Sequence, residues 1–218
     1  MSDTDSFIDE VTEEVRRDRL FAFMKRWGWV AVLLVLVLVG GAAWREYTSV
    51  RDQAAAQALG DEILAALDAD EAGARVSALS EISAAGPGAQ ALIDMLTASE
   101  AARAGDSDAA EQALEAVASN GDVPEIYREI ASYKAFSRSD SGLSAEDRRV
   151  GLEALAVPGK PLRLLAEEQL ALLEIEQGDT DAATARLQRI IEDSEATAGL
   201  RQRASQLIVA MGGKPDAG

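Results

Sequence analysis

An uncharged, largely apolar stretch at residues 27–44 constrains this chain more than any other feature. It reads WGWVAVLLVLVLVGGAAW. As an α-helix it is roughly 27 Å long, at about 1.5 Å per residue, which matches the hydrocarbon core of a bilayer. Aromatic residues, whose rings prefer the lipid headgroups, stand at both ends: Trp27, Trp29, Trp44 and Tyr47. We therefore expect residues 27–44 to cross a membrane once.

The charges around this stretch predict its orientation. Positive side chains stay on the cytoplasmic side of a membrane, and five of them precede the stretch closely, whereas two follow it. The five are Arg16, Arg17, Arg19, Lys25 and Arg26, and the two are Arg45 and Arg51. We therefore expect a cytoplasmic N-terminus. The exported part, residues 45–218, carries 31 acidic and 16 basic side chains.

A cleaved signal peptide is the alternative to a membrane anchor. Gly40, Gly41, Ala42 and Ala43 are small enough for a signal peptidase site. A signal peptide, however, has a short basic start and about 15–30 residues in all. Here residues 1–26, with seven acids among them, precede the apolar run. This length favours a retained anchor.

Residues 1–26 are expected to form an amphipathic cytoplasmic segment. Its apolar residues begin at helical spacing, and its charges change from mostly acidic to mostly basic toward the membrane. The basic half can meet anionic lipid. The segment then serves as a topology signal, and recognition of a partner is the alternative.

The composition excludes most catalytic chemistry. The chain has no Cys and no His, so it has neither a thiolate nor an imidazole for nucleophilic, acid-base or zinc chemistry. A net charge of -17 argues against nucleic acid as a partner. We assign no catalytic, cofactor or metal residues. Asp106 with Asp108, and the matching Asp179 with Asp181, lack the spacing of a calcium loop and are expected near helix starts.

The pattern after residue 44 predicts an all-α fold. Apolar residues recur with a period near 3.6, and only 5% of residues are aromatic. We expect the membrane helix to continue outward as a stalk, followed by a helical domain within residues 45–211 and a flexible tail, 212–218. Gly and Pro breaks separate the expected helices, the first of them stopped at Gly86, Pro87 and Gly88. These helices are residues 71–85, 88–104, 107–119, 124–138, 145–156, 161–177, 180–193 and 198–211.

An internal repeat is visible in this domain. Residues 105–110, GDSDAA, are echoed by residues 178–183, GDTDAA, at an interval of 73 positions. Both copies continue with one apolar helix face, in which Ala110 and Ala183 are the small positions expected at a close helix contact. Gly in the turn, then Ala, then a bulky residue is the pattern of the second helix of a tetratricopeptide repeat.

The agreement with that repeat is partial. Leu170 and Ala171 fit its first helix, but no copy has the consensus Trp, and the interval is five positions longer than two ideal units of about 34. The pair formed by residues 124–157 must be degenerate. An irregular Ala-rich helical bundle is the alternative fold.

This layout resembles the alphaproteobacterial members of the YfgM-like family, which are tetratricopeptide-repeat-like proteins of the bacterial inner membrane. The resemblance covers nearly the whole chain, and its most specific part is EEVRRDRLFAFMKRWG, beginning at Glu13. It implies a periplasmic solenoid that associates with the Sec translocon. It also implies a chaperone-like role beside membrane-anchored periplasmic folding factors and exported client proteins.

One segment is a candidate protein-binding surface. Residues 125–138, EIYREIASYKAFSR, hold two of the three Tyr and one of the four Phe. First helices of such repeats line the concave face, so these side chains are candidates for contacting a partner: Tyr127, Arg128, Tyr133, Lys134 and Phe136. Aromatic residues at helical spacing are also typical of a core, which is the alternative.

The sequence therefore predicts a single-pass inner-membrane protein whose helical domain binds other proteins near the translocon. An accessory or assembly subunit of another inner-membrane complex is one alternative. A membrane-tethered enzyme is another, and the absence of His, Cys and a convergent acid pair argues against it. No feature of the sequence specifies an oligomeric state.

Overall fold

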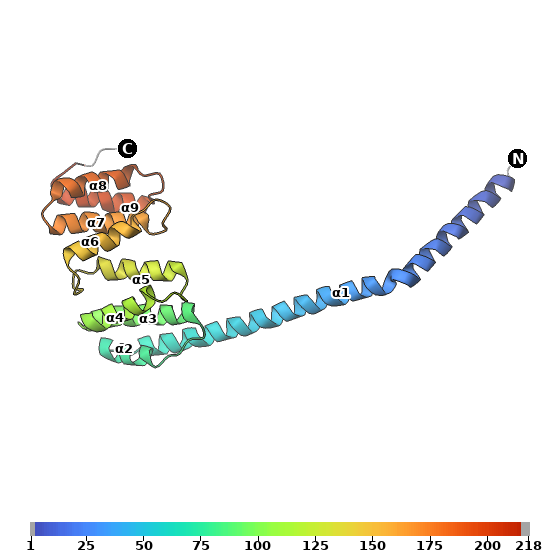
Figure 1. Ribbon diagram of the computed structural model, residues 1–218, viewed down its shortest axis with the longest axis horizontal. Coiled ribbons are helices and arrows are strands. Elements are labelled where there is room, and N and C mark those ends of the chain that lie inside the picture. Colours follow the sequence, from blue (N-terminus) through green and yellow to red (C-terminus); the bar gives the residue numbers. More distant parts are fainter. Residues whose placement is uncertain (1–2, 215–218) are drawn as a thin grey trace. The chain divides into compact units, whose positions relative to one another are not determined.

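A computed structural model describes residues 3–214, and it describes their side chains except those of residues 3–24, 27, 28, 31 and 32. Within these residues all regular structure is helical, which confirms the all-α prediction (Figure 1). The helices are α1 (Asp3–Leu67), α2 (Ala72–Ser80), α3 (Pro87–Arg103), α4 (Ser107–Ala118), α5 (Glu125–Ser137), α6 (Ala145–Leu155), α7 (Arg163–Glu176), α8 (Thr180–Glu192) and α9 (Ala198–Ala210). The chain divides into two compact units, Met1–Leu59 and Gly60–Gly218.

The first unit consists of the larger part of α1. In α1 the stretch Leu33–Leu67, most of which belongs to this unit, is long and apolar enough to cross a membrane, and it is the one such stretch found in the described residues. Large apolar side chains on it are exposed around the helix, among them Leu36 and Trp44 at 66% and 70%. The predicted span, residues 27–44, overlaps this stretch. Of the predicted amphipathic segment, residues 1 and 2 and the side chains of residues 3–24 lie outside the described residues.

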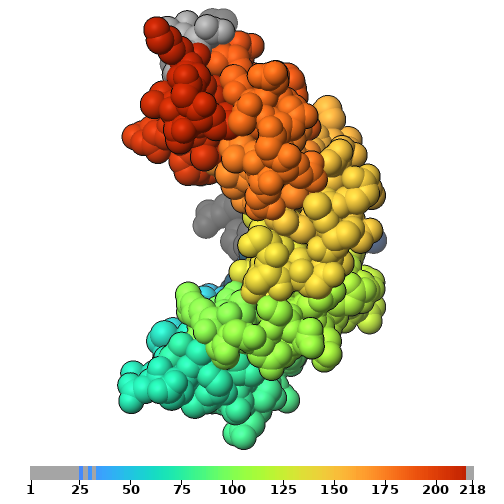
Figure 2. Space-filling view, turned by 90° about the vertical axis from the view of Figure 1, so that its left-hand side faces the viewer, coloured from blue at the N-terminus to red at the C-terminus, as the bar shows by residue number. Residues whose placement is uncertain are grey.

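The second unit is a stack of helices in chain order. Each helix from α2 to α9 packs against the next, and α3 also touches α5. Figure 2 shows the stack running from cyan at α2 to red at α9. The buried residues are mainly Ala, Leu and Ile, gathered in successive small clusters between neighbouring helices. This neighbour-to-neighbour packing is that of a helical repeat protein.

The predicted helix boundaries after residue 87 agree with the structure within two residues. The first expected helix, residues 71–85, was wrong at its end, because α2 stops at Ser80. Pro87 is the first residue of α3, where its missing N–H costs nothing, and Gly86 before it has φ 101°. The turn between α2 and α3 must therefore lie before Gly86. Within this turn the N–H of Ala84 donates a hydrogen bond to Gln90 Oε1.

The internal repeat extends beyond the motif that revealed it. The turns at Gly105 and Gly178 both have φ 80°, and in each the next residue, Asp106 or Asp179, accepts a hydrogen bond at 3.0 Å from the N–H three positions on. Gly86 and Gly159 are separated by the same interval, and both have positive φ. Helices α5 and α9 begin and end at that interval as well. Unit 2 thus contains two matching halves of four helices.

The second helix of the degenerate pair, α6, and its counterpart α2 differ from α4 and α8 at one position. The fourth residue of α4 and α8 is the fully buried alanine Ala110 or Ala183. The fourth residue of α2 and α6 is an arginine, Arg75 or Arg148, again related by the repeat interval. Each arginine pairs with a glutamate of the next helix, Arg75 with Glu100 at 2.6 Å and Arg148 with Glu176 at 3.0 Å. Small and long residues therefore alternate along the stack.

Candidate protein-binding surface

A cavity of about 370 Å³ opens beside the aromatic segment that the sequence singled out. Helices α3, α5 and α7, the first helices of their pairs, line most of it. We call it the Lys134 cavity, and its lining includes Ala98, Ser99, Ala102, Leu114, Tyr133, Lys134, Ser137, Arg138, Asp140 and Gln169. The structure thus brings two predicted site residues, Tyr133 and Lys134, to one hollow.

Lys134 has an unusual environment in this cavity. Its ammonium is partly buried and donates a hydrogen bond to Ser99 Oγ at 3.0 Å. No carboxylate of the described residues forms an ion pair with it. A partly buried ammonium is commonly paired with a carboxylate, because withdrawing an unpaired charge from water is costly. Lys134 therefore has unused capacity to bind an acceptor.

The same cavity is also lined by an ion pair. The Arg138 guanidinium donates from Nε and Nη2 to the two oxygens of Asp140 at 3.0 and 2.9 Å, and the Ser107 hydroxyl donates to the same carboxylate. Hydrogen bonds from Arg138, more than from Ser107, lower the pKa of Asp140 to about 2. Asp140 is thus ionised at neutral pH, with both carboxylate oxygens accepting hydrogen bonds.

A second cavity, of about 480 Å³, lies between α7 and α9 and shares Gln169 with the first. We call it the Leu207 cavity, and its lining is Glu168, Gln169, Leu172, Arg203, Gln206, Leu207 and Ala210. Glu168 and Arg203 form two parallel hydrogen bonds of 2.8 Å across it. Such a fork leaves neither charge unpaired.

The two cavities are related by the internal repeat. Four pairs of lining residues stand one repeat interval apart: Ser99 and Leu172, Tyr133 and Gln206, Lys134 and Leu207, Ser137 and Ala210. Ala131 and Ala204, which anchor α5 and α9 in their cores, are equally related and both fully buried. The cavities therefore have equivalent positions in the two halves and different linings.

The same comparison separates structural from functional candidates. Tyr127 is half-buried against the core cluster of α3 and α4, and its counterpart Leu200 is a core residue at 4% exposure. Arg128 donates to the carbonyl oxygen of Val123 in the preceding loop, and its counterpart Arg201 donates likewise to the carbonyl oxygen of Asp193, which follows α8. Tyr127 and Arg128 thus have structural roles that their counterparts also fill in the second half.

Phe136 and Tyr133 both pack on the cluster of α6 and α7, which contains Leu152 and Leu170. A Cβ added to Gly151 of α6 would lie 2.4 Å from the Phe136 ring, so this glycine makes room for the ring. Phe136 does not line the Lys134 cavity, whereas Tyr133 does. Of the five predicted residues, Tyr133 and Lys134 line this cavity and the other three do not. Their role in binding a partner stays a prediction.

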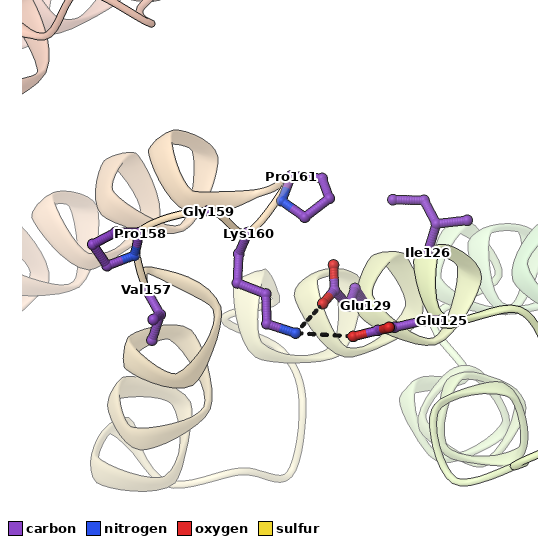
Figure 3. A pocket seen from close by; sticks show the side chains of 8 residues that line it. All are labelled: Glu125, Ile126, Glu129, Val157, Pro158, Gly159, Lys160 and Pro161. Atoms are coloured by element: carbon purple, nitrogen blue, oxygen red, sulfur yellow. Dashed lines mark hydrogen bonds and ion pairs between the residues drawn. The ribbon is translucent and has the colours of Figure 1, made fainter.

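A third hollow, of about 570 Å³, lies between the start of α5 and the turn before α7 (Figure 3). Lys160 of that turn donates to Glu129 at 2.5 Å and to Glu125 at 3.1 Å, as the dashed lines in Figure 3 show. These hydrogen bonds raise the pKa of Lys160, and Lys160 lowers the pKa of Glu125. The Lys160 ammonium is already neutralised by these carboxylates. We therefore interpret this hollow as a structural contact between α5 and the turn before α7.

In the acidic pairs near the repeated turns, the first aspartate of each pair has a structural role. Asp106 and Asp179 cap the helices α4 and α8, as the sequence predicted. No group of three or more metal-ligating side chains gathers anywhere in the part of the chain described by the structure.

Sequence reasoning missed the Leu207 cavity. It also missed that Lys134 has no carboxylate partner among the described residues. The repeat interval was the signal for the first, because it relates Leu207 and Lys134 directly. Nothing in the sequence signalled the second, since a lysine without a carboxylate neighbour is recognised only once the helices are packed.

Comparison with known proteins gives one informative result. A family model described as the tetratricopeptide repeat-like domain matches residues 22–135, slightly more than half of the chain. The matched span includes the apolar stretch of α1 and ends within α5. No curated protein and no solved structure matches the chain.

Proposed function

Because the chain belongs to the tetratricopeptide repeat-like domain family, we propose that it is a membrane-anchored module that binds other proteins. The binding surface is the one on which the Lys134 and Leu207 cavities open, formed mainly by α3, α5, α7 and α9. We call it the cavity face. Domains of this kind suggest protein interaction and are typically not catalytic.

The adjoining cavities are the observation that carries this proposal. They share Gln169, so a single polypeptide segment lying along the cavity face would reach both. Their linings combine aliphatic walls with a few polar groups, which is typical of sites that bind by burial and orient by hydrogen bonding. The chain's lack of Cys and His also favours binding over chemistry.

The membrane stretch of α1 supports the setting of this binding. With the N-terminus in the cytoplasm, as the five basic residues before the stretch favour, unit 2 would face the periplasm. Confinement at the membrane raises the effective concentration of a binder near its target, so weak contacts suffice. Together with the resemblance to the YfgM-like family, this favours an ancillary, chaperone-like role at the Sec translocon, with exported chains as clients.

Photocrosslinking in native membranes tests the proposal. A photoreactive amino acid replaces Gln169, the residue common to both cavities. We expect crosslinks to Sec-dependent exported chains and to translocon subunits. The matched control is Gln112, an exposed residue in a separate hollow lined by α4 and the residue that follows it, Ser119. Comparable products from both positions, or products lacking exported chains, would refute the proposal.

A further inference from the structure

The two repeat-related cavities present different chemistry at equivalent positions. Three polar side chains of the first, Ser99, Lys134 and Ser137, correspond to Leu172, Leu207 and Ala210 in the second. The helices that carry them are placed alike, because Ala131 of α5 and Ala204 of α9 are both fully buried. The second half therefore serves as an internal control for the first.

This control shows that packing does not require a lysine at position 134. Leu207 is half-buried at the same place in α9 and fills it with an apolar side chain. Elsewhere in unit 2, Lys160 is held by two carboxylates, whereas Lys134 has a single neutral hydroxyl. A cation that packing does not need and that no described carboxylate neutralises points to a bound anion.

Two further donors lie beside it without acceptors. Ser137 Oγ and Arg138 Nη1 are buried, and neither has a hydrogen-bond partner in the described part of the chain. Buried side-chain donors are nearly always satisfied, so an unsatisfied pair calls for an explanation. The acid that lines the same cavity, Asp140, already accepts from Arg138 and Ser107. Residues that line the cavity thus carry donors without a described acceptor.

We propose, resting on the proposed function, that the Lys134 cavity binds the carboxylate of an Asp or Glu side chain of the partner segment, while the Leu207 cavity takes an apolar side chain of the same segment. The carboxylate oxygens accept from the Lys134 ammonium. Ala98, Ala102 and Leu114 surround the methylene stem of the acid. A volume of about 370 Å³ is more than enough for one such side chain.

The repeat also sets the spacing of the two side chains. Equivalent positions in the two halves are two pairs of helices apart, or two helix spacings along the cavity face, roughly 16–20 Å. An extended chain covers this distance in about six residues at roughly 3.3 Å each. The segment recognised therefore carries an acid and an apolar residue about six positions apart.

Blocked peptides test the proposal on the full-length chain in detergent micelles. The probe is an acetylated, amidated and fluorescently labelled peptide of Gly and Ser with Glu and Leu six positions apart, made in both orders to cover either chain direction. Its Kd is measured by fluorescence anisotropy against empty micelles. A Gln-for-Glu peptide lacks the charge, and the same Gln peptide with a free C-terminus offers a terminal carboxylate instead.

We expect the Glu peptide, in one order, to bind roughly tenfold more tightly than the Gln peptide, as one charge-assisted contact implies. Lys134→Leu should abolish this difference while the protein stays folded, because the second half already has leucine there. Lys214→Leu removes the same charge from an exposed position outside the cavity and should preserve the difference. Leu207→Lys should weaken binding of the Glu and Leu peptide and strengthen binding of a peptide with two Glu.

Three results would overturn the inference. The first is equal affinity of the wild type for the Glu and Gln peptides, and the second is an unchanged affinity difference between these peptides in Lys134→Leu. The third is a wild type that binds the Gln peptide with a free C-terminus as tightly as the Glu peptide. A Leu207→Lys variant that binds both peptides like the wild type would overturn the apolar subsite. Each of these results leaves the crosslinks from Gln169 intact if the broader function holds. Loss of those crosslinks would instead refute the function itself.

Discussion

Gly151 shows at the scale of one residue how the second unit accommodates an aromatic ring. It lies inside α6, where replacing glycine by alanine normally stabilises a helix by up to about 1 kcal/mol. Here the added Cβ would meet three ring carbons of Phe136 at 2.4 to 2.5 Å. We therefore predict that Gly151→Ala destabilises the protein by about 1–3 kcal/mol through overpacking.

Thermal melts followed by circular dichroism check this prediction on the full chain. The matched control is Gly199→Ala in α9, where nothing lies within 4 Å of the added Cβ. That variant should be neutral or slightly more stable than the wild type. Indistinguishable melting temperatures for the two variants would show that Phe136 does not pack as described.

Asp140 makes the stability of the protein depend on pH. Its pKa is about 2 in the folded state, below the ordinary value of 3.8, because Arg138 and Ser107 hydrogen-bond the ionised form. A group whose pKa is lowered by folding stabilises the protein above its unfolded pKa, and this contribution disappears as the pH falls from about 4 to about 2. The contribution is below about 1 kcal/mol, because the side chain is 54% exposed and solvent screens the pair.

Asp140→Asn should therefore lower the free energy of unfolding at pH 7 and match the wild type near pH 2. Urea midpoints at both pH values measure the difference in stability between Asp140→Asn and the wild type. Arg138→Gln removes the main cause of the pKa shift. In a protein carrying Arg138→Gln, the effect of Asp140→Asn should therefore be smaller over the same pH range. A gap of constant size across this range would exclude Asp140 as its source.

At the scale of helices, Ala183 tests the register of the second unit. It is fully buried in α8, which packs against α7, whereas Ala185 two residues later is exposed. Ala183→Leu should overpack this contact and cost about 1–3 kcal/mol, while Ala185→Leu should cost little. Chemical denaturation of both variants provides the comparison. Similar losses at the two positions would contradict the helix register.

Helix boundaries and the repeated turns were predictable because Gly and Pro act locally. The turn at Gly105 needs positive φ and an acid cap, and both requirements are visible in a few consecutive residues. The role of Arg148 was not predictable, because an arginine in the place of an alanine resembles a lost repeat. Only the packed structure shows its ion pair with Glu176 and its hydrogen bond to the Phe136 carbonyl oxygen.

The candidate site was predictable to a smaller extent. Lys134 and Tyr133 stood out as members of an aromatic and basic segment, and both line a cavity. Tyr127 looked the same in sequence, yet it faces the core cluster of α3 and α4. Helical spacing gives the face of a residue on its own helix, but the partners of that face depend on contacts with helices far along the chain.

At the scale of the whole molecule, the central prediction is topology. Five basic residues before the apolar stretch against two after it favour a cytoplasmic N-terminus and an exported second unit. The chain has no cysteine, so a single Ser194→Cys change, at an exposed position, provides a unique label site. A membrane-impermeant thiol reagent should modify it from the periplasmic side of intact cells.

Ser6→Cys is the matched control and should react only after the inner membrane is opened. Modification of the cysteine at position 194 from the cytoplasmic side alone would reverse the topology. It would also remove the basis for a role with exported chains.

The neighbour-to-neighbour packing of α2 to α9 has a consequence for how the second unit is made. Each helix finds its main partners in the helices just before and after it, so the contacts are short-range in sequence and the loops to be closed are small. Such a chain can begin to assemble from its first helices without waiting for the last ones. If unit 2 is threaded through a translocon with α2 leading, the order of emergence is also the order of assembly.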